Sequence, residues 1–259
     1  MSYAILRTLS LCAVVGFLAA AMQQACAAEC LVGADKLKDA LKANVNASGG
    51  PSNGGFDNNE WAVVIARDGT ICAVTYSGNT VGDQWPASRP IAAEKANTAN
   101  GVSLPNFAIS SANLYAQSQP GGYLYGALTS DPPDPAMLGA GNAANWGTTA
   151  DPWVNKRLGG VIVFGGGLAL YDTNHNVVGA IGVSGDTSCA DHNVAWRVRH
   201  ALGLDKVPNG PSKNHNDAII YDIGPNGKSA SGFGHPTCGV KEEQIAEQIG
   251  AGVGAAPSR

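Results

Sequence analysis

The chain has 259 residues, of which 44% are hydrophobic and 14% are charged, and its formal net charge is −4. Its 34 glycines and 14 prolines make up about 19% of the chain, below the ~25–30% typical of low-complexity sequence. This composition excludes a disordered chain, because disorder requires low hydrophobicity and high charge. Without a basic cluster, we expect no nucleic-acid partner and no binding to an anionic membrane surface.

Residues 1–27 have the pattern of a secretory signal peptide. Arg7 precedes an apolar run from Leu9 to Met22, and Ala25-Cys26-Ala27 has the small-x-small form of a cleavage site. The run is shorter than the ~20 residues of a membrane-spanning helix, so a membrane anchor is the less favoured alternative. Lipidation of Cys26 is a second alternative that fits poorly. We therefore expect a periplasmic or secreted protein without a membrane span.

The mature chain, residues 28–259, has the length of a single domain. A proline-rich stretch within residues 129–157 indicates an ordered insertion, in which Trp146 and Trp153 supply apolar surface to bury. This insertion is also a candidate surface for a protein partner. Residues 205–259 form a C-terminal extension.

Four cysteines remain after removal of the signal peptide, and an even number in an oxidising compartment predicts two disulfides. Three pairings are possible. We favour Cys30–Cys72, which would tie the first helix to a strand, and Cys189–Cys238, which would tie the C-terminal tail to a loop. Because His192 and His235 lie close in sequence to the second pair, a tetrahedral zinc site is the alternative there.

The first half of the mature chain predicts a helix, a hairpin and two further helices. Apolar residues recur at helical spacing within residues 31–45. Two β-rich runs, 61–66 and 70–76, flank an Asp-Gly turn and predict a hairpin. Residues 90–102 and 107–117 are the two expected helices.

The second half predicts another hairpin and an amphipathic helix. Residues 168–172 and 177–183 are strand-like and are joined by a short polar turn, and residues 191–202 have a helical apolar face. Residues 219–223 predict a short strand and 240–249 a last helix. Strand pairs joined by tight turns predict an antiparallel sheet with helices packed on it.

The most distinctive motif is Gly179-Ala-Ile-Gly-Val-Ser-Gly-Asp186. Its glycine spacing differs from the dinucleotide-binding fingerprint. Asp186 stands where a nucleophile elbow needs glycine, so a serine hydrolase using Ser184 with Asp191 and His192 is a minor alternative. The glycines are equally explained by close backbone packing at a strand end.

Three segments together resemble the GlcG/HbpS-like haem-binding, also called haem-degrading, family. They are Glu94-Lys-Ala-Asn-Thr-Ala99, the glycines at 159–160 and 165–167, and the 178–186 motif followed by Asp191. The resemblance implies an α/β (α+β) profilin-like sandwich, a five-stranded antiparallel sheet with helices on both faces. It also implies homo-oligomers and a non-covalently bound haem.

The positions that match the family pattern are expected to form the haem site. They are Lys95, Thr98, Gly182, Ser184, Gly185 and Asp191. Lys95 is a candidate partner for a haem propionate, and His192 is our candidate axial ligand to the iron, because neutral imidazole suits iron. The chain departs from the pattern at Val161–Val163, where proline is usual, and in its insertion.

The sequence thus favours an exported haem-binding protein in haem or iron handling or in redox sensing. A non-haem small-ligand or protein-assembly module of the same fold is the alternative. A haem-degrading enzyme is a weaker alternative, since no flavin or nicotinamide site is evident and electrons would have to come from outside.

Overall fold

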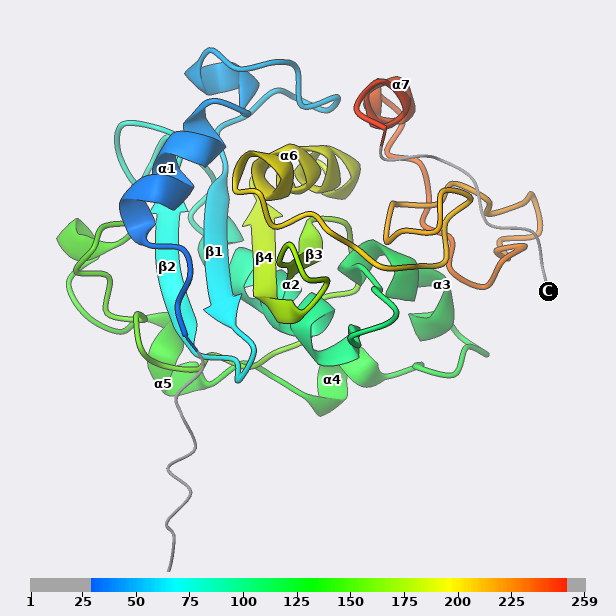
Figure 1. The fold of residues 1–259 in the computed structure, drawn as a ribbon, viewed down its shortest axis with the longest axis horizontal. Helices are drawn as coiled ribbons and strands as arrows, with labels where there is room; N and C mark the ends of the chain where they lie inside the picture. Colours follow the sequence, from blue (N-terminus) through cyan, green and yellow to red (C-terminus); the bar gives the residue numbers. More distant parts are fainter. Residues whose placement is uncertain (1–28, 251–259) are drawn as a thin grey trace, which may run out of the picture.

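The computed structural model describes residues 29–250 (Figure 1). The expected signal peptide lies outside these residues. The described part contains one antiparallel sheet with the strand order β2-β1-β4-β3. Its strands are β1 (Trp61–Ala66), β2 (Ile71–Tyr76), β3 (Gly167–Tyr171) and β4 (Val177–Ser184). The fold class is therefore as expected, but the described sheet has four strands rather than five.

Both predicted hairpins are present, and they join through β1 and β4. β1 pairs with β2 and β3 pairs with β4, while β1 and β4 form the centre of the sheet, from Trp61 opposite Ser184 to Ala66 opposite Gly179. Gly69 adopts a left-handed φ of +84° in the first turn, which an Asp-Gly turn supplies without steric cost. β4 ends at Ser184, and the last two residues of the distinctive motif, Gly185 and Asp186, lie in the loop that leads to α6.

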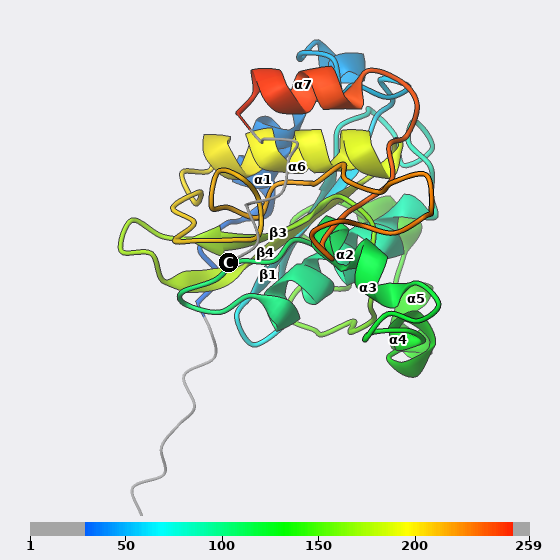
Figure 2. The same cartoon turned by 90° about the vertical axis from the view of Figure 1, so that its right-hand side faces the viewer.

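Helices cover both faces of the sheet (Figures 1 and 2). One face packs against α1 (Ala34–Lys42) and α6 (Ser188–Ala201), and the other against α2 (Ser88–Val102). Alternation along β1 explains this arrangement, because Ala62 and Val64 lie in the first core whereas Val63 and Ile65 lie in the second. In Figure 2, α7 (Glu242–Gln248), α6, the sheet and α2 follow one another from top to bottom.

Gly182 sets the distance between α2 and β4. A Cβ atom at this position would lie 1.8 Å from the carbonyl oxygen of Ala92 and 2.6 Å from the nitrogen of Ala96. The alanine face of α2 therefore packs directly against the strand backbone. The explanation of the motif's glycines by close packing applies at this position.

Two predicted elements are wrong. Residues 107–117 do not form one helix; η2 (Ser111–Leu114) and α3 (Tyr115–Ser118) are single turns. Polar side chains take the backbone bonds there, because Asn113 Oδ1 accepts the Ser110 N–H and Ser103 Oγ accepts the Ile109 N–H. Residues 219–223 pack on α6 as an irregular segment instead of adding a strand.

Residues 129–157, where the sequence predicts an insertion, contact α2 through Arg89. Arg89 forms a buried 2.7 Å ion pair with Asp151, and its guanidinium lies 3.4 Å from the ring centroid of Trp153 and 4.5 Å from that of Trp146. Three short helices lie in or next to this stretch: α4 (Ala127–Ser130), α5 (Pro135–Leu138) and η3 (Ala143–Asn145). The cation–π contacts of Arg89 with the two tryptophans hold the stretch against α2.

Both disulfides occur in the favoured pairing. Cys30–Cys72 ties the segment before α1 to β2, and Cys189–Cys238 ties α6 to the C-terminal extension. Among residues 29–250, no helix is long and apolar enough to cross a membrane.

Candidate functional site

The distinctive motif ends in a buried junction between α2, β4 and α6. Lys95 Nζ on α2 lies 2.6 Å from Asp191 Oδ2 on α6, and each side chain is 2% exposed. The same ammonium donates to the Val183 carbonyl at 3.3 Å and lies 3.5 Å from Ser184 Oγ. Asp191 Oδ1 accepts the N–H of Gly185. We call Lys95, Ser184, Gly185 and Asp191 the junction.

The helix start explains why Asp191 points into this loop. Thr187 caps α6, its Oγ1 accepting the Ala190 N–H at 3.2 Å. α6 thus begins three residues earlier than the sequence predicts, which places Asp191 in the first turn. There its Oδ1 also accepts the Asp186 N–H at 2.8 Å, and the helix N-terminus favours its negative charge.

Two further carboxyl groups lie beside the junction. Asp186 accepts the Phe56 N–H at 2.7 Å and the Asn58 N–H at 3.2 Å. Glu60 is fully buried, and burial, followed by repulsion from Asp191 and Asp186, raises its pKa well above the usual range. Burial also raises the pKa of Asp191 to about 6, although pairing with Lys95 opposes this rise. The raised pKa of Glu60 reduces the negative charge that this residue adds beside Asp186 and Asp191.

The structure brings four of the motif-matched residues together and places Thr98 one turn further along α2. Thr98 Oγ1 donates to the Glu94 carbonyl and accepts the Ile162 N–H at 2.9 Å. At Gly185, a Cβ atom would lie 2.5 Å from the Asn59 carbonyl oxygen. These residues hold α2, β4 and the α6 loop together, and in this arrangement they face one another rather than an open cleft.

His192 is enclosed within the protein. Its Nε2 accepts the backbone N–H of Ile219 at 3.1 Å, and its Nδ1 has no partner among the described residues. The ring stacks on Trp196 with centroids 6.2 Å apart. Burial, followed by the charge of Arg199, lowers the pKa of His192 well below its usual range, so the imidazole is neutral.

A second group of polar residues lies where the C-terminal extension meets the start of α6. It consists of Ser188, Cys189, His235, Cys238 and Glu242, which we call the C-terminal cluster. The His235 ring donates to or accepts from Ser188 Oγ at 3.4 Å, and its Nδ1 lies 2.6 Å from the Pro236 carbonyl oxygen. Burial lowers the pKa of His235 to about 4.

Aromatic residues that the sequence did not single out lie against this cluster. The Tyr115 ring centroid is 5.3 Å from that of His235, and Phe164 lies 6.5 Å from His235 and 6.1 Å from Tyr115. Phe164 is 38% exposed. The sequence signal that could have identified Phe164 is its position directly before the glycines at 165–167. Those glycines let the turn approach α6, because a Cβ at Gly165 would lie 2.2 Å from the Ser188 carbonyl oxygen.

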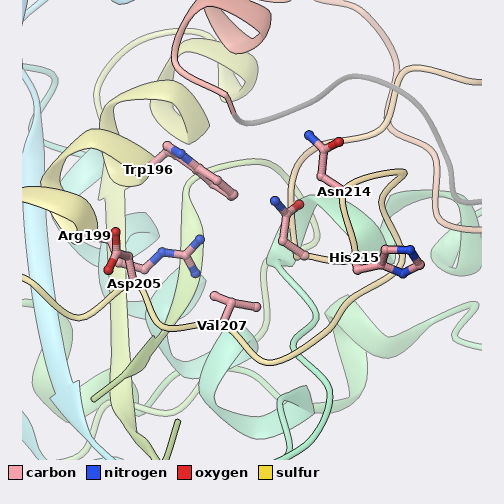
Figure 3. Close-up of a pocket in the computed structure, with 7 residues that line it drawn as sticks. Trp196, Arg199, Asp205, Val207, Asn214 and His215 are labelled. Carbon is pink, nitrogen blue, oxygen red and sulfur yellow. The ribbon is translucent and has the colours of Figure 1, made fainter. Parts of the chain in front are cut away.

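A polar pocket of about 200 Å³ opens beside the C-terminal half of α6 (Figure 3). Trp196, Val207 and His215 line it together with Arg199, which makes two hydrogen bonds of 2.7 and 2.8 Å to Asp217. Its volume is below the ~300–1,000 Å³ of typical small-molecule pockets. A flat macrocycle does not fit it.

The donor chemistry around His192 and His235 suits haem iron, because both imidazoles are neutral and an exposed aromatic ring lies nearby. The geometry of His192 is more demanding. Its Nε2 becomes available only when Ile219 and the segment around it move away. Lys95 likewise meets a propionate only by leaving Asp191.

Comparison with known proteins gives a family match and several similar solved structures. The model of a family described as haem degrading protein HbpS-like matches residues 57–199. No curated protein matches. Similar solved structures include protein ORFY of Klebsiella pneumoniae (TM-score 0.45, 20% identity, covering 66% of this chain and 88% of that one).

Two further similar structures carry descriptions that mention haem or HbpS. They are a PduOC:heme complex (TM-score 0.45, 19% identity, 67% of this chain and 94% of that one) and an HbpS double mutant from Streptomyces reticuli (TM-score 0.43, 18% identity, 76% and 99%). The family match spans β1 to α6, which includes the whole junction. The chain belongs to the HbpS-like family of haem-degrading proteins.

Proposed function

We propose that this chain is an exported protein that binds haem non-covalently, in haem or iron handling or in redox sensing. The observation that carries the proposal is the family match over residues 57–199. Two neutral, buried imidazoles beside an exposed phenylalanine supply donor groups and a flat apolar contact of the kind that haem requires.

His192 is the proposed axial ligand, reached when the segment around Ile219 moves off its Nε2. In this proposal Lys95, Thr98, Ser184, Gly185 and Asp191 support the site mainly by holding the loop from which α6 starts. A ligand that must displace a backbone N–H binds more weakly and more slowly than one entering an open pocket. Slow uptake of haem is therefore part of the proposal.

The test is a hemin titration of residues 28–259 followed by the Soret absorption. We expect saturation near one haem per chain, and at least tenfold weaker binding, about 1.4 kcal/mol, in His192→Ala. His200→Ala is the matched control, because His200 is on the same helix with a side chain 78% exposed. An unchanged spectrum and affinity in His192→Ala would remove His192 from this role.

The same titration separates the alternatives. A non-saturating response typical of surface adsorption would overturn haem binding and favour the non-haem binding or assembly module. Loss of the Soret band after addition of ascorbate, with release of iron, would favour the haem-degrading enzyme. The mass of the purified chain in solution tests the homo-oligomer, and the N-terminus of protein recovered outside the cytoplasm tests export and cleavage before Ala28.

A further inference from the structure

We propose that the C-terminal cluster is a redox-controlled binding site for a thiophilic divalent cation such as Zn²⁺. The Cys189–Cys238 disulfide closes the site, and reduction by a dithiol opens it. This proposal does not depend on haem binding.

The donor atoms already converge. The two Sγ atoms of Cys189 and Cys238 and a carboxylate oxygen of Glu242 all lie within 4.8 Å of one another. Within residues 29–250, this is the one group of three or more such side chains that meets this spacing. Two thiolates and a carboxylate leave one position of a tetrahedral Zn²⁺ site for a further donor.

Glu242 is a buried anion without a basic partner. Its Oε1 accepts the Gly239 N–H and its Oε2 the Val240 N–H, each at 2.9 Å. Among the described residues, no Lys, Arg or His forms an ion pair with Glu242. A carboxyl group held in place by backbone N–H groups beside two sulfurs supplies part of a cation site.

His235 lies next to the site but does not complete it. Its Nδ1 is 3.9 Å from Cys189 Sγ, yet it donates to the Pro236 carbonyl oxygen at 2.6 Å and so has no lone pair for a cation. The ring is almost fully buried and covers one side of the two sulfurs. The fourth position of the site is therefore left to a water molecule, as in zinc sites with three protein ligands.

The start of α6 favours thiolates once the disulfide is reduced. Cys189 is the second residue of this 14-residue helix, and its N–H donates to Cys238 Sγ at 3.3 Å. A backbone N–H at a helix N-terminus lowers the pKa of a cysteine. A metal ion that binds the two reduced sulfurs displaces their protons.

The site is open to a reductant from one side. Cys189 is fully buried, whereas Cys238 is half-buried. A surface hollow of about 290 Å³ lies over the flanking residues Thr237 and Gly239 and reaches Glu242. One thiolate of the dithiol attacks Cys238 Sγ, the S–S bond breaks, and Cys189 leaves as a thiolate. The second thiol of the reagent then attacks the mixed disulfide, which releases the Cys238 thiolate and the oxidised, cyclic reagent.

The test is a Cd²⁺ titration of residues 28–259, oxidised and after reduction with dithiothreitol followed by its removal under anaerobic conditions. We expect one Cd²⁺ per reduced chain, with a sulfur-to-cadmium charge-transfer band in the ultraviolet, and no band in the oxidised chain. The band should disappear in the Cys189→Ser, Cys238→Ser double variant and persist in the Cys30→Ser, Cys72→Ser double variant.

Glu242→Gln distinguishes the folded site from a reduced and unfolded chain. We expect it to weaken Cd²⁺ binding at least tenfold, while Glu243→Gln, at the exposed neighbouring position, leaves it unchanged. The proposal is overturned by a reduced chain without the band, by a band that survives loss of Cys189 and Cys238, or by equal affinities in the two glutamate variants.

Discussion

The junction and the C-terminal cluster both lie at the start of α6, but their polar groups are satisfied differently. In the junction, the Lys95 ammonium and the Asp191 carboxylate face each other and also bond the backbone of the β4–α6 loop. In the C-terminal cluster, the Glu242 carboxylate is met by backbone N–H groups alone and lies beside a disulfide and a neutral His235. The charged groups of the junction are therefore paired with each other, whereas the Glu242 carboxyl group of the cluster has no basic partner among the described residues. The residues that match a family pattern can therefore be residues that hold the fold together rather than residues that contact a ligand.

The largest expected effect comes from breaking the junction. Lys95→Met leaves Asp191 buried without its cation, and removal of one partner of a buried ion pair costs about 3–5 kcal/mol. Urea unfolding of residues 28–259 measures this free energy. Arg157→Met is the matched control, since the Arg157–Asp68 pair is exposed and such pairs contribute about 0–1 kcal/mol. Equal losses in the two variants would contradict the distinction between the two regions.

The next effect is in the cluster and depends on pH. His235 is neutral in the folded protein with a pKa of about 4, against 6.5 in the unfolded chain. The unfolded chain therefore binds the additional proton, and stability should fall as pH drops from about 6.5 to about 4, by up to about 3 kcal/mol. His235→Gln should remove that part of the acid slope. His200→Gln, at an exposed position, should leave the slope as it is.

A smaller effect tests the packing beneath the junction. Gly182→Ala places a Cβ against the Ala92 carbonyl, where the backbone of α2 must shift, and such overpacking costs about 1–3 kcal/mol. Gly101→Ala is the control within α2, because a Cβ there meets nothing within 4 Å; it should be neutral or stabilise by up to about 1 kcal/mol. Thermal unfolding distinguishes these opposite signs.

The smallest effect lies on the outer side of α2. Burial raises the pKa of Glu94 to about 7, so its contribution to stability is complete below pH 4.5 and is lost as pH rises to about 7. Glu94→Gln should match the parent chain at pH 4 and exceed its melting temperature at pH 8. The half-buried position keeps this gain small. A variant that is less stable at pH 8 would show that the Glu94 charge is favourable in the fold.

Local signals in the sequence determined the elements that depend on near neighbours. The Asp-Gly turn after Arg67 between two β-rich runs predicted the first hairpin, a short polar turn predicted the second, and apolar residues at helical spacing predicted α1. The family pattern also identified Lys95, Ser184 and Asp191 as a group that meets in space. The helix expected at 107–117 does not form, because the backbone N–H groups of Ile109 and Ser110 donate to side chains instead of to helical carbonyls.

The tertiary structure decided what those groups can do. Lys95 and Asp191, which the sequence predicts to contact a ligand, are buried and form an ion pair that links α2 to α6. The Ile219 N–H occupies Nε2 of His192. In the C-terminal cluster, Cys189 contacts His235 and Cys238, which lie 46 and 49 positions further along the chain. Spacing along the chain carries little information about such contacts, because burial and partners are set by the whole packed chain rather than by neighbours in sequence.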